Sequence, residues 1–178
     1  MKYVALLRGI NVGGNKKVEM PRLKESFERM DYKNVRTYIN SGNVIFESSK
    51  KAEERLASNI EKALEQEFGF AIHVLVRSGE NIAKVARSVP ATWENNGEQK
   101  TDVLFLWEKF ANKKTIDLIE VHKKVDTLRY IDGAIIWHID KKDYSKSGMH
   151  NFIGTDVYKH MTARNINTVR KLTALLKA

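Results

Sequence analysis

The chain has 178 residues, a formal net charge of +9 and no cysteine. The lack of cysteine excludes disulfides and thiol catalysis, and it fits a reducing cytoplasm, which is the location we expect. Apolar residues make up 42% of the chain, so a buried core is expected and wholesale disorder is not. No apolar run approaches the ~18 residues of a membrane span, and Arg8 comes too early for a secretory signal.

The first part of the chain has the pattern of a split βαβ unit. A short, continuously apolar run near the N-terminus predicts a strand buried on both faces, and a proline predicts the first turn of a helix. We expect strands over residues 3–7, 34–39, 43–48 and 70–77, with helices that begin at Pro21 and that span 51–69. The order βαββαβ is that of a ferredoxin-like fold.

The second part repeats this pattern incompletely. After a connecting helix that Pro90 stops and a polar loop, we expect strands over residues 101–107, 125–131 and 134–140, with helices over 113–124, 154–161 and 166–178. Asp132-Gly133 predicts a tight hairpin turn between the last two strands. The order is βαββα, with a final helix where a fourth strand would complete the repeat.

The expected fold class is therefore α+β, with two tandem ferredoxin-like subdomains and antiparallel sheets. We expect one subdomain over residues 1–78, a connecting helix and loop over 79–99, and a second subdomain over 100–178. In the first subdomain, a right-handed crossover makes the first two strands parallel. The loop after the first strand and the turn after the second should then be neighbours at one edge of the sheet.

The loop after the first strand reads LLRGINVGGNKKVEMP. It is close to a Walker A motif, but Asn15 stands where that motif has its lysine and Val18 offers no hydroxyl for magnesium. Glycines permit left-handed backbone and successive N–H groups that bind anions, and lysines add charge. We interpret it as an anion-binding loop with candidate residues Arg8, Asn11, Gly13, Gly14 and Lys16; the alternative is a structural loop.

The turn Asn-Ser-Gly-Asn supplies three more candidates for ligand hydrogen bonds: Ser41, Gly42 and Asn43. Ordinary turn chemistry explains the same residues, since glycine provides the positive φ that such turns need. A nucleophilic role for Ser41 would require a base, and no histidine lies nearby in the sequence.

Two C-terminal segments complete the candidate site. Residues 141–152 interleave lysines, among them Lys146, with Tyr144 and Phe152, which is a pattern that can bind phosphates and stack bases; a flexible polar loop is the alternative. Residues 162–172 are expected to open the last helix with Thr162 as N-cap. Arg164 and Asn165 are candidate ligand residues, because a cation near a helix N-terminus is favourable where an anion also binds.

The charge distribution supports an anionic partner. Residues 1–48 carry nine Lys and Arg against five Asp and Glu, and residues 140–178 carry eight against three, while the middle is balanced. If the two ends meet, they form one basic surface that attracts phosphates; a solvated basic surface is the alternative. The five histidines are scattered without ligand spacing, so no metal site is expected.

Four motifs together resemble the Domain of Unknown Function 1697 family of small bacterial proteins. They are LLRGINVGG, TYINSGNVIF, the SKS after the penultimate strand, and TARNINTVRKL. The resemblance covers essentially the whole chain and implies two tandem ferredoxin-like subdomains, but it implies no activity. The family usually has tryptophan at position 166 and leucine at 147, where this chain has Ile166 and Ser147, which weakens a role for aromatic stacking at 166.

These observations lead to three hypotheses about function. The first is a protein that binds an anionic small molecule, namely a nucleotide or a phosphorylated metabolite, or a nucleic acid such as RNA. The second is an enzyme acting on such a ligand, with Ser41, Ser145 or Lys146 transferring protons. The third is a structural or protein-interaction module that associates through sheet edges. None of them requires a cofactor or a membrane.

Overall fold

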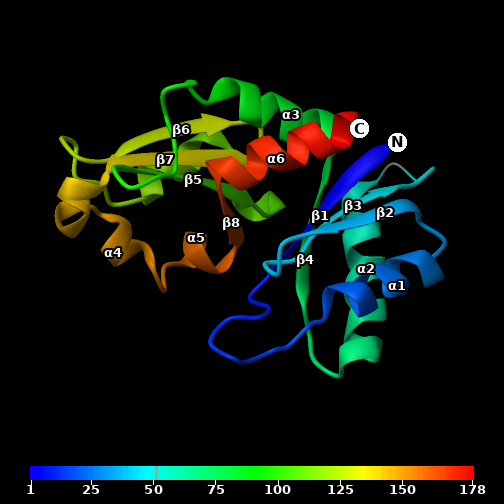
Figure 1. Ribbon diagram of the computed structural model, residues 1–178. Helices are drawn as coiled ribbons and strands as arrows, with labels where there is room; N and C mark the ends of the chain where they lie inside the picture. The colour runs from blue at the N-terminus through cyan, green and yellow to red at the C-terminus, as the bar shows by residue number, and fades with distance from the viewer. Residues whose placement is uncertain (51) are drawn as a thin grey trace. The chain divides into compact units, whose positions relative to one another are not determined.

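The computed structural model describes residues 1–50 and 52–178, and it divides into two units. The first comprises Met1–Ile82 and Leu175–Ala178, and the second comprises Ala83–Ala174. Each unit contains a four-stranded antiparallel sheet (Figure 1). The predicted α+β class with two ferredoxin-like subdomains is confirmed. The narrower limits 1–78 and 100–178 stay a prediction.

The first sheet has the strand order β2-β3-β1-β4. β1 pairs antiparallel with β3 and β4, and β2 pairs antiparallel with β3, so β1 and β2 run parallel as predicted. The elements are β1 (Lys2–Arg8), α1 (Met20–Arg29), β2 (Lys33–Tyr38), β3 (Asn43–Glu47), α2 (Glu53–Phe68), β4 (His73–Ser78) and α3 (Gly79–Ser88). Lys51, the first residue of the expected helix over 51–69, lies outside the described residues.

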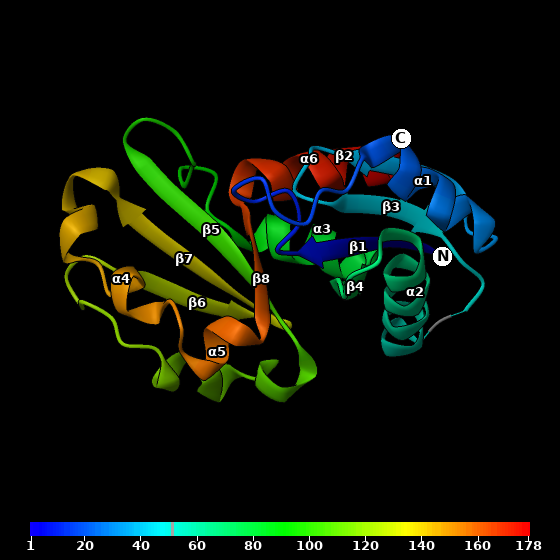
Figure 2. The same ribbon diagram turned by 90° about the horizontal axis from the view of Figure 1, so that it is seen from below.

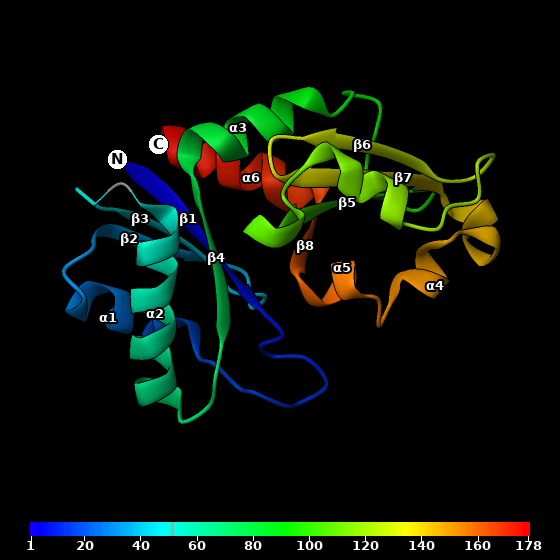
Figure 3. The same cartoon turned by 180° about the vertical axis from the view of Figure 1, so that it is seen from behind.

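Alternation along β1 and a helical stripe on α2 build the core of the first unit. Tyr3, Ala5 and Leu7 share one sheet face because successive strand residues alternate. α1 and α2 pack on the same side of the sheet (Figure 3). α2 buries residues spaced one turn apart, and Gly69 ends it with a left-handed φ of 79°. The buried stripe of α2 consists of Leu56, Ile60 and Leu64.

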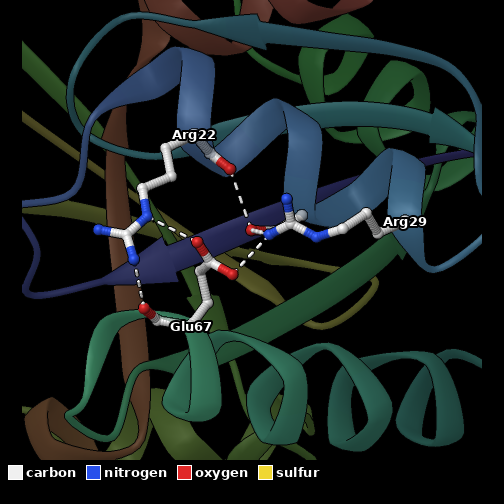
Figure 4. A network of polar contacts seen from close by, with 4 residues as sticks. Arg22, Arg29 and Glu67 are labelled. Atoms are coloured by element: carbon white, nitrogen blue, oxygen red, sulfur yellow. Dashed lines mark hydrogen bonds and ion pairs between the residues drawn. The ribbon is translucent and has the colours of Figure 1, made fainter.

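A three-residue ion network joins α1 to the end of α2 (Figure 4). Glu67 Oε1 accepts from Arg22 Nε at 2.6 Å, and its Oε2 accepts from Arg29 at 2.5 Å. Arg22 also donates to the Glu67 carbonyl and lies 5.0 Å from the Phe68 ring. The hydrogen bond from Arg22 is the main cause that lowers the pKa of Glu67. Glu67 thus links the two helices while it stays ionised.

Carboxylates of α2 cap the outer edge of β4. Glu61 Oε1 accepts from the Val74 backbone N–H at 2.8 Å, and Glu53 Oε1 accepts from that of Ser78 at 2.7 Å. β4 is an edge strand, so these N–H groups point away from β1. An open edge of this kind is a template for pairing with another chain, and the two glutamates block it.

The second sheet has the order β6-β7-β5-β8, which is the topology of the first sheet (Figure 2). Its hairpin turn is formed by Asp132 and Gly133, both with positive φ, as predicted. The elements are β5 (Gln99–Leu106), β6 (Thr127–Ile131), β7 (Ala134–Asp140), α4 (Met149–Phe152), α5 (Asp156–Lys159), β8 (Met161–Asn165), α6 (Ile166–Lys177) and the 3₁₀ helices η1 (Glu108–Phe110), η2 (Lys113–Leu118) and η3 (Lys141–Lys146).

Strand β8 corrects the prediction that the second unit lacks a fourth strand. β5 needs a partner on its second edge, and Met161–Asn165 pairs antiparallel with Asp102–Leu106. The expected helix over 154–161 is therefore only the single turn α5. Tertiary pairing overrides local helical propensity here.

The expected helix over 113–124 is also wrong in length and type. It is the 3₁₀ helix η2, which ends at Leu118, and Ile119 already has extended backbone. Thr115 donates its hydroxyl to the Phe110 carbonyl, a side-chain hydrogen bond that competes with helical backbone bonding. The β-branched residues that come after Thr115 in the sequence also disfavour an α-helix.

The glutamate that caps β4 gives a stability prediction. Glu61→Ala leaves the buried Val74 N–H without its acceptor and should lower the unfolding free energy by about 1–2 kcal/mol in urea denaturation. Glu61→Gln keeps a side-chain carbonyl and should lose less. Exposed Glu65→Ala on the same helix is the control and should change stability by less than about 0.5 kcal/mol. Equal losses for Glu61→Ala and Glu65→Ala would contradict the capping role.

Candidate functional site

The loop between β1 and α1 is a small hairpin. The Asn15 N–H donates to the Val12 carbonyl at 3.0 Å, and Gly13 and Gly14 between them have φ of 58° and 79°. Two successive positive φ values define a type I′ turn. The expectation that these glycines adopt left-handed backbone is confirmed.

Asn11 closes the base of this hairpin. Its Oδ1 accepts from the Val18 N–H at 2.8 Å, and its Nδ2 donates to the Val18 carbonyl at 2.9 Å. The same Nδ2 donates to the Asn40 carbonyl at 2.9 Å, which ties the loop to the turn between β2 and β3. Asn11 was a candidate ligand residue, but its amide already bridges backbone groups of the protein. Its φ of 55° is one that asparagine tolerates.

The turn between β2 and β3 packs directly against the loop, as predicted from the crossover. The Leu7 N–H donates to the Gly42 carbonyl at 2.9 Å. A Cβ on Gly42 would lie 2.7 Å from Ile10 Cδ1 and 2.8 Å from Leu7 Cβ, so only glycine fits. The Asn43 side chain is completely buried and donates to the Tyr38 carbonyl and to Ser41 Oγ. Gly42 and Asn43 therefore shape the turn, and Ser41 remains at its surface.

The hairpin presents an exposed basic tip. Gly13, Gly14, Asn15, Lys16 and Lys17 are all exposed, and neither lysine forms an ion pair with the described carboxylates. Two apolar side chains are also exposed at these loops, Val12 at 67% and Ile39 at 45%. We define the hairpin tip as residues 12–17. It is a hydrogen-bonded backbone turn with two lysines.

Within the second unit, the candidate residues have structural contacts of their own. Lys146 pairs with Asp143 at 3.0 Å. Arg164 lies on β8 and is 7% exposed; it donates to Thr162 Oγ1 at 3.0 Å and to the Ala163 carbonyl at 2.8 Å. Burial lowers the pKa of Arg164 to about 10, so it stays charged at neutral pH.

Asn165 is the N-cap of α6. Its Oδ1 accepts from the Thr168 N–H at 2.9 Å, the third residue of that helix. The expectation that Thr162 caps the helix is wrong, because Thr162 belongs to strand β8. Arg8 is in the first unit and Arg164 in the second, and their sharing of one basic surface stays a prediction.

The buried carboxylate of Asp126 is not indicated by any sequence pattern. Its Oδ1 accepts from Trp137 Nε1 at 2.9 Å and from Ser147 Oγ at 2.5 Å. Its Oδ2 accepts from the N–H groups of His122 at 2.7 Å and Gly148 at 2.9 Å. Burial raises the pKa of Asp126, but the four hydrogen bonds outweigh it, so the pKa lies below its usual value. Ser147-Gly148 of the SKSG segment thus anchors to Asp126.

This chain is an α+β protein with two ferredoxin-like units and a conformationally fixed glycine-rich loop after its first strand. It belongs to the family described as Protein of unknown function (DUF1697), whose profile matches residues 1–137. It is similar to the conserved bacterial protein SP0830 from Streptococcus pneumoniae, at 29% identity and a TM-score of 0.82 over 98% of each chain. No curated protein matches the sequence.

The described part of the chain contains neither a metal-binding cluster nor a membrane-spanning helix. Within residues 1–50 and 52–178, no three His, Asp or Glu side chains are grouped so as to hold a metal ion. None of the helices described there is long and apolar enough to cross a lipid bilayer.

Two glycines of the loop region should differ in their response to substitution. Gly42→Ala combines a φ of 77° with contacts under 3 Å and should destabilise by about 3 kcal/mol. Gly14→Ala has a φ of 79° but open space around its Cβ, so strain alone should cost about 1 kcal/mol. Gly97→Ala, without either feature, is the control. Urea denaturation measures all three, and equal losses at positions 42 and 14 would contradict the packing argument.

The Asp126 carboxylate should make the second unit sensitive to acid. Asp126→Asn places an amide N–H₂ among four donors and should lower stability at pH 6 by about 2–3 kcal/mol. Since the folded pKa is lowered, the stabilisation is full above the unfolded pKa of ~3.9 and is lost as the pH falls below it.

The stability difference between wild type and Asp126→Asn should therefore narrow between pH 6 and pH 3. Exposed Asp117→Asn serves as the matched control. A difference that stays constant over this range would show that the carboxylate charge is not what the four donors stabilise.

Proposed function

We propose that this protein binds a phosphate-bearing anion at the hairpin tip, residues 12–17. The single observation that carries the proposal is the pair of exposed lysines, Lys16 and Lys17, on a turn whose backbone is already fixed. Neither lysine is paired with a carboxylate in the described part of the chain. Unpaired cations on a fixed backbone favour an anionic partner.

The conformation of the loop supports this proposal. Asn11 holds the base of the hairpin through three hydrogen bonds of 2.8 to 2.9 Å, and the two central turn residues, Gly13 and Gly14, have no side chain. A ligand can therefore approach the backbone of the tip closely, and little backbone entropy is lost on binding. Ser41, at the surface of the adjacent turn, adds a hydroxyl beside the base of the loop.

A nucleotide, a phosphorylated metabolite and RNA share this phosphate chemistry. Three probes distinguish these ligand classes: inorganic phosphate, ATP and a fluorescein-labelled 12-nucleotide RNA. Charge-assisted contacts from lysines should contribute to each of them. Only the RNA should show a steep dependence on salt, because it alone releases many condensed counterions.

The test is Lys16→Ala/Lys17→Ala, with Lys113→Ala/Lys114→Ala as control. Both variants remove two adjacent exposed lysines, but the control pair lies in the second unit. The tip variant should weaken binding about tenfold and, for the single-stranded RNA, reduce the slope of log K against log salt by about 1.4. The measurements are thermal shift and fluorescence anisotropy. If both variants bind every probe as wild type does, the hairpin tip is not the anion site.

A further inference from the structure

Two basic segments of the second unit lie side by side because both attach to Asp126. The first is His122-Lys123-Lys124, whose His122 N–H donates to Oδ2. The second runs from Lys141 to Gly148, and its Ser147 and Gly148 donate to the same carboxylate. The chain between the segments spans β6 and β7, so their closeness is not visible in the sequence.

The contact between these segments is close and specific. A Cβ on Gly148 would lie 2.2 Å from the Glu120 carbonyl oxygen, so the backbone of the second segment touches the chain just before the first. The hydrogen bond from Lys146 is the main cause that lowers the pKa of Asp143, and the charge of His122 has a smaller effect in the same direction. The juxtaposition is therefore a fixed feature of the second unit.

The surface that results is positive. Lys123, Lys124 and Lys142 are exposed and form no ion pair with the described carboxylates. Lys146 forms an ion pair with Asp143, so the negative charge of that carboxylate is largely neutralised. The net charge over residues 101–139 is zero, so this average does not reveal the basic run at residues 122–124.

The second segment also carries a partly exposed aromatic ring, that of Tyr144, between Lys142 and Lys146 in the sequence. Tyr144 is 40% exposed, and its ring meets that of His150 edge to face at 4.6 Å and 61°. The Tyr144 carbonyl accepts from the Ser147 N–H at 3.1 Å, and it lies 2.9 Å from His150 Nε2. The backbone around Tyr144 is therefore fixed while part of its ring faces solvent.

We propose that this surface binds single-stranded RNA, with a base stacked on Tyr144 and phosphates on Lys123, Lys124 and Lys142. An exposed ring with flanking lysines matches how single strands are bound, since every base has a π-face and every nucleotide a phosphate. Duplex RNA keeps its bases stacked inside and offers none to Tyr144. This surface lies in the second unit and shares no residue with the hairpin tip, so different variants test the two sites.

The stacking contact is tested with a fluorescein-labelled 12-nucleotide poly(U) RNA and the full chain. In fluorescence anisotropy at 50 mM salt, Tyr144→Ala should weaken binding about tenfold. Tyr144→Phe keeps the ring and should bind within about twofold of wild type. Equal losses for the two variants would overturn the stacking role. A 12-base-pair duplex bound as tightly as poly(U) would overturn the single-strand preference.

The phosphate contacts are tested with Lys123→Ala/Lys142→Ala, which removes one lysine from each segment. The slope of log K against log salt should fall by about 1.4, the value for two contacts to a single strand. Lys62→Ala/Lys177→Ala removes two exposed lysines of the first unit and should leave the slope unchanged. Equal slopes for both double variants, or no poly(U) binding by the wild type at 50 mM salt, would overturn the proposal.

Discussion

The first strand of each unit is the constraint on which the rest of the fold depends. β1 and β5 each pair antiparallel on both edges, and their central residues are buried on both faces. The stretches buried on both faces, residues 3–7 of β1 and 103–106 of β5, are continuously apolar, and the polar residues lie toward the strand ends. Because β1 and β2 are parallel, the loops that leave them emerge at one edge of the sheet. The topology itself thus brings the glycine-rich loop and the β2–β3 turn together.

Each unit fixes its long connections with one polar side chain. In the first unit a neutral amide, Asn11, has both donor and acceptor and can satisfy an N–H and two carbonyls at once. In the second unit the groups to be satisfied are all donors, and the ionised carboxylate of Asp126 accepts from four of them. The chemical type of each anchor follows from the groups that surround it.

The sequence predicts most of the first unit because its local signals agree with one another. β1 is apolar on both faces, Pro21 opens α1, and Gly69 ends α2 in left-handed backbone. The second unit is harder because its signals conflict. The residues of β8 adjoin a strongly helical segment, and only the open edge of β5 makes them a strand. The pattern does predict the hairpin at Asp132-Gly133, where turn chemistry is specific.

The candidate sites divide in the same way between local and long-range information. Positive φ at Gly13 and Gly14 is a local property, and the sequence indicates it correctly. Three candidate ligand residues, Asn11, Asn43 and Asn165, prove to hold backbone groups of the protein. A polar side chain in a turn has the same sequence signal whether it binds the chain or a ligand. Asp126 carries no signal, since three of its four donors lie 11 to 22 residues away from it along the chain.

Both proposed binding surfaces keep a fixed backbone and leave lysine side chains free. Ordering a long side chain at an interface costs ~0.5–1.5 kcal/mol, and a loop that had to order its backbone as well would cost more. In the hairpin tip, Asn11 and the type I′ turn supply that order before a ligand arrives. In the segment around Tyr144, Asp126 supplies it. If ligands bind as proposed, these anchors would act through the free state: they would remove an entropic cost without touching the ligand.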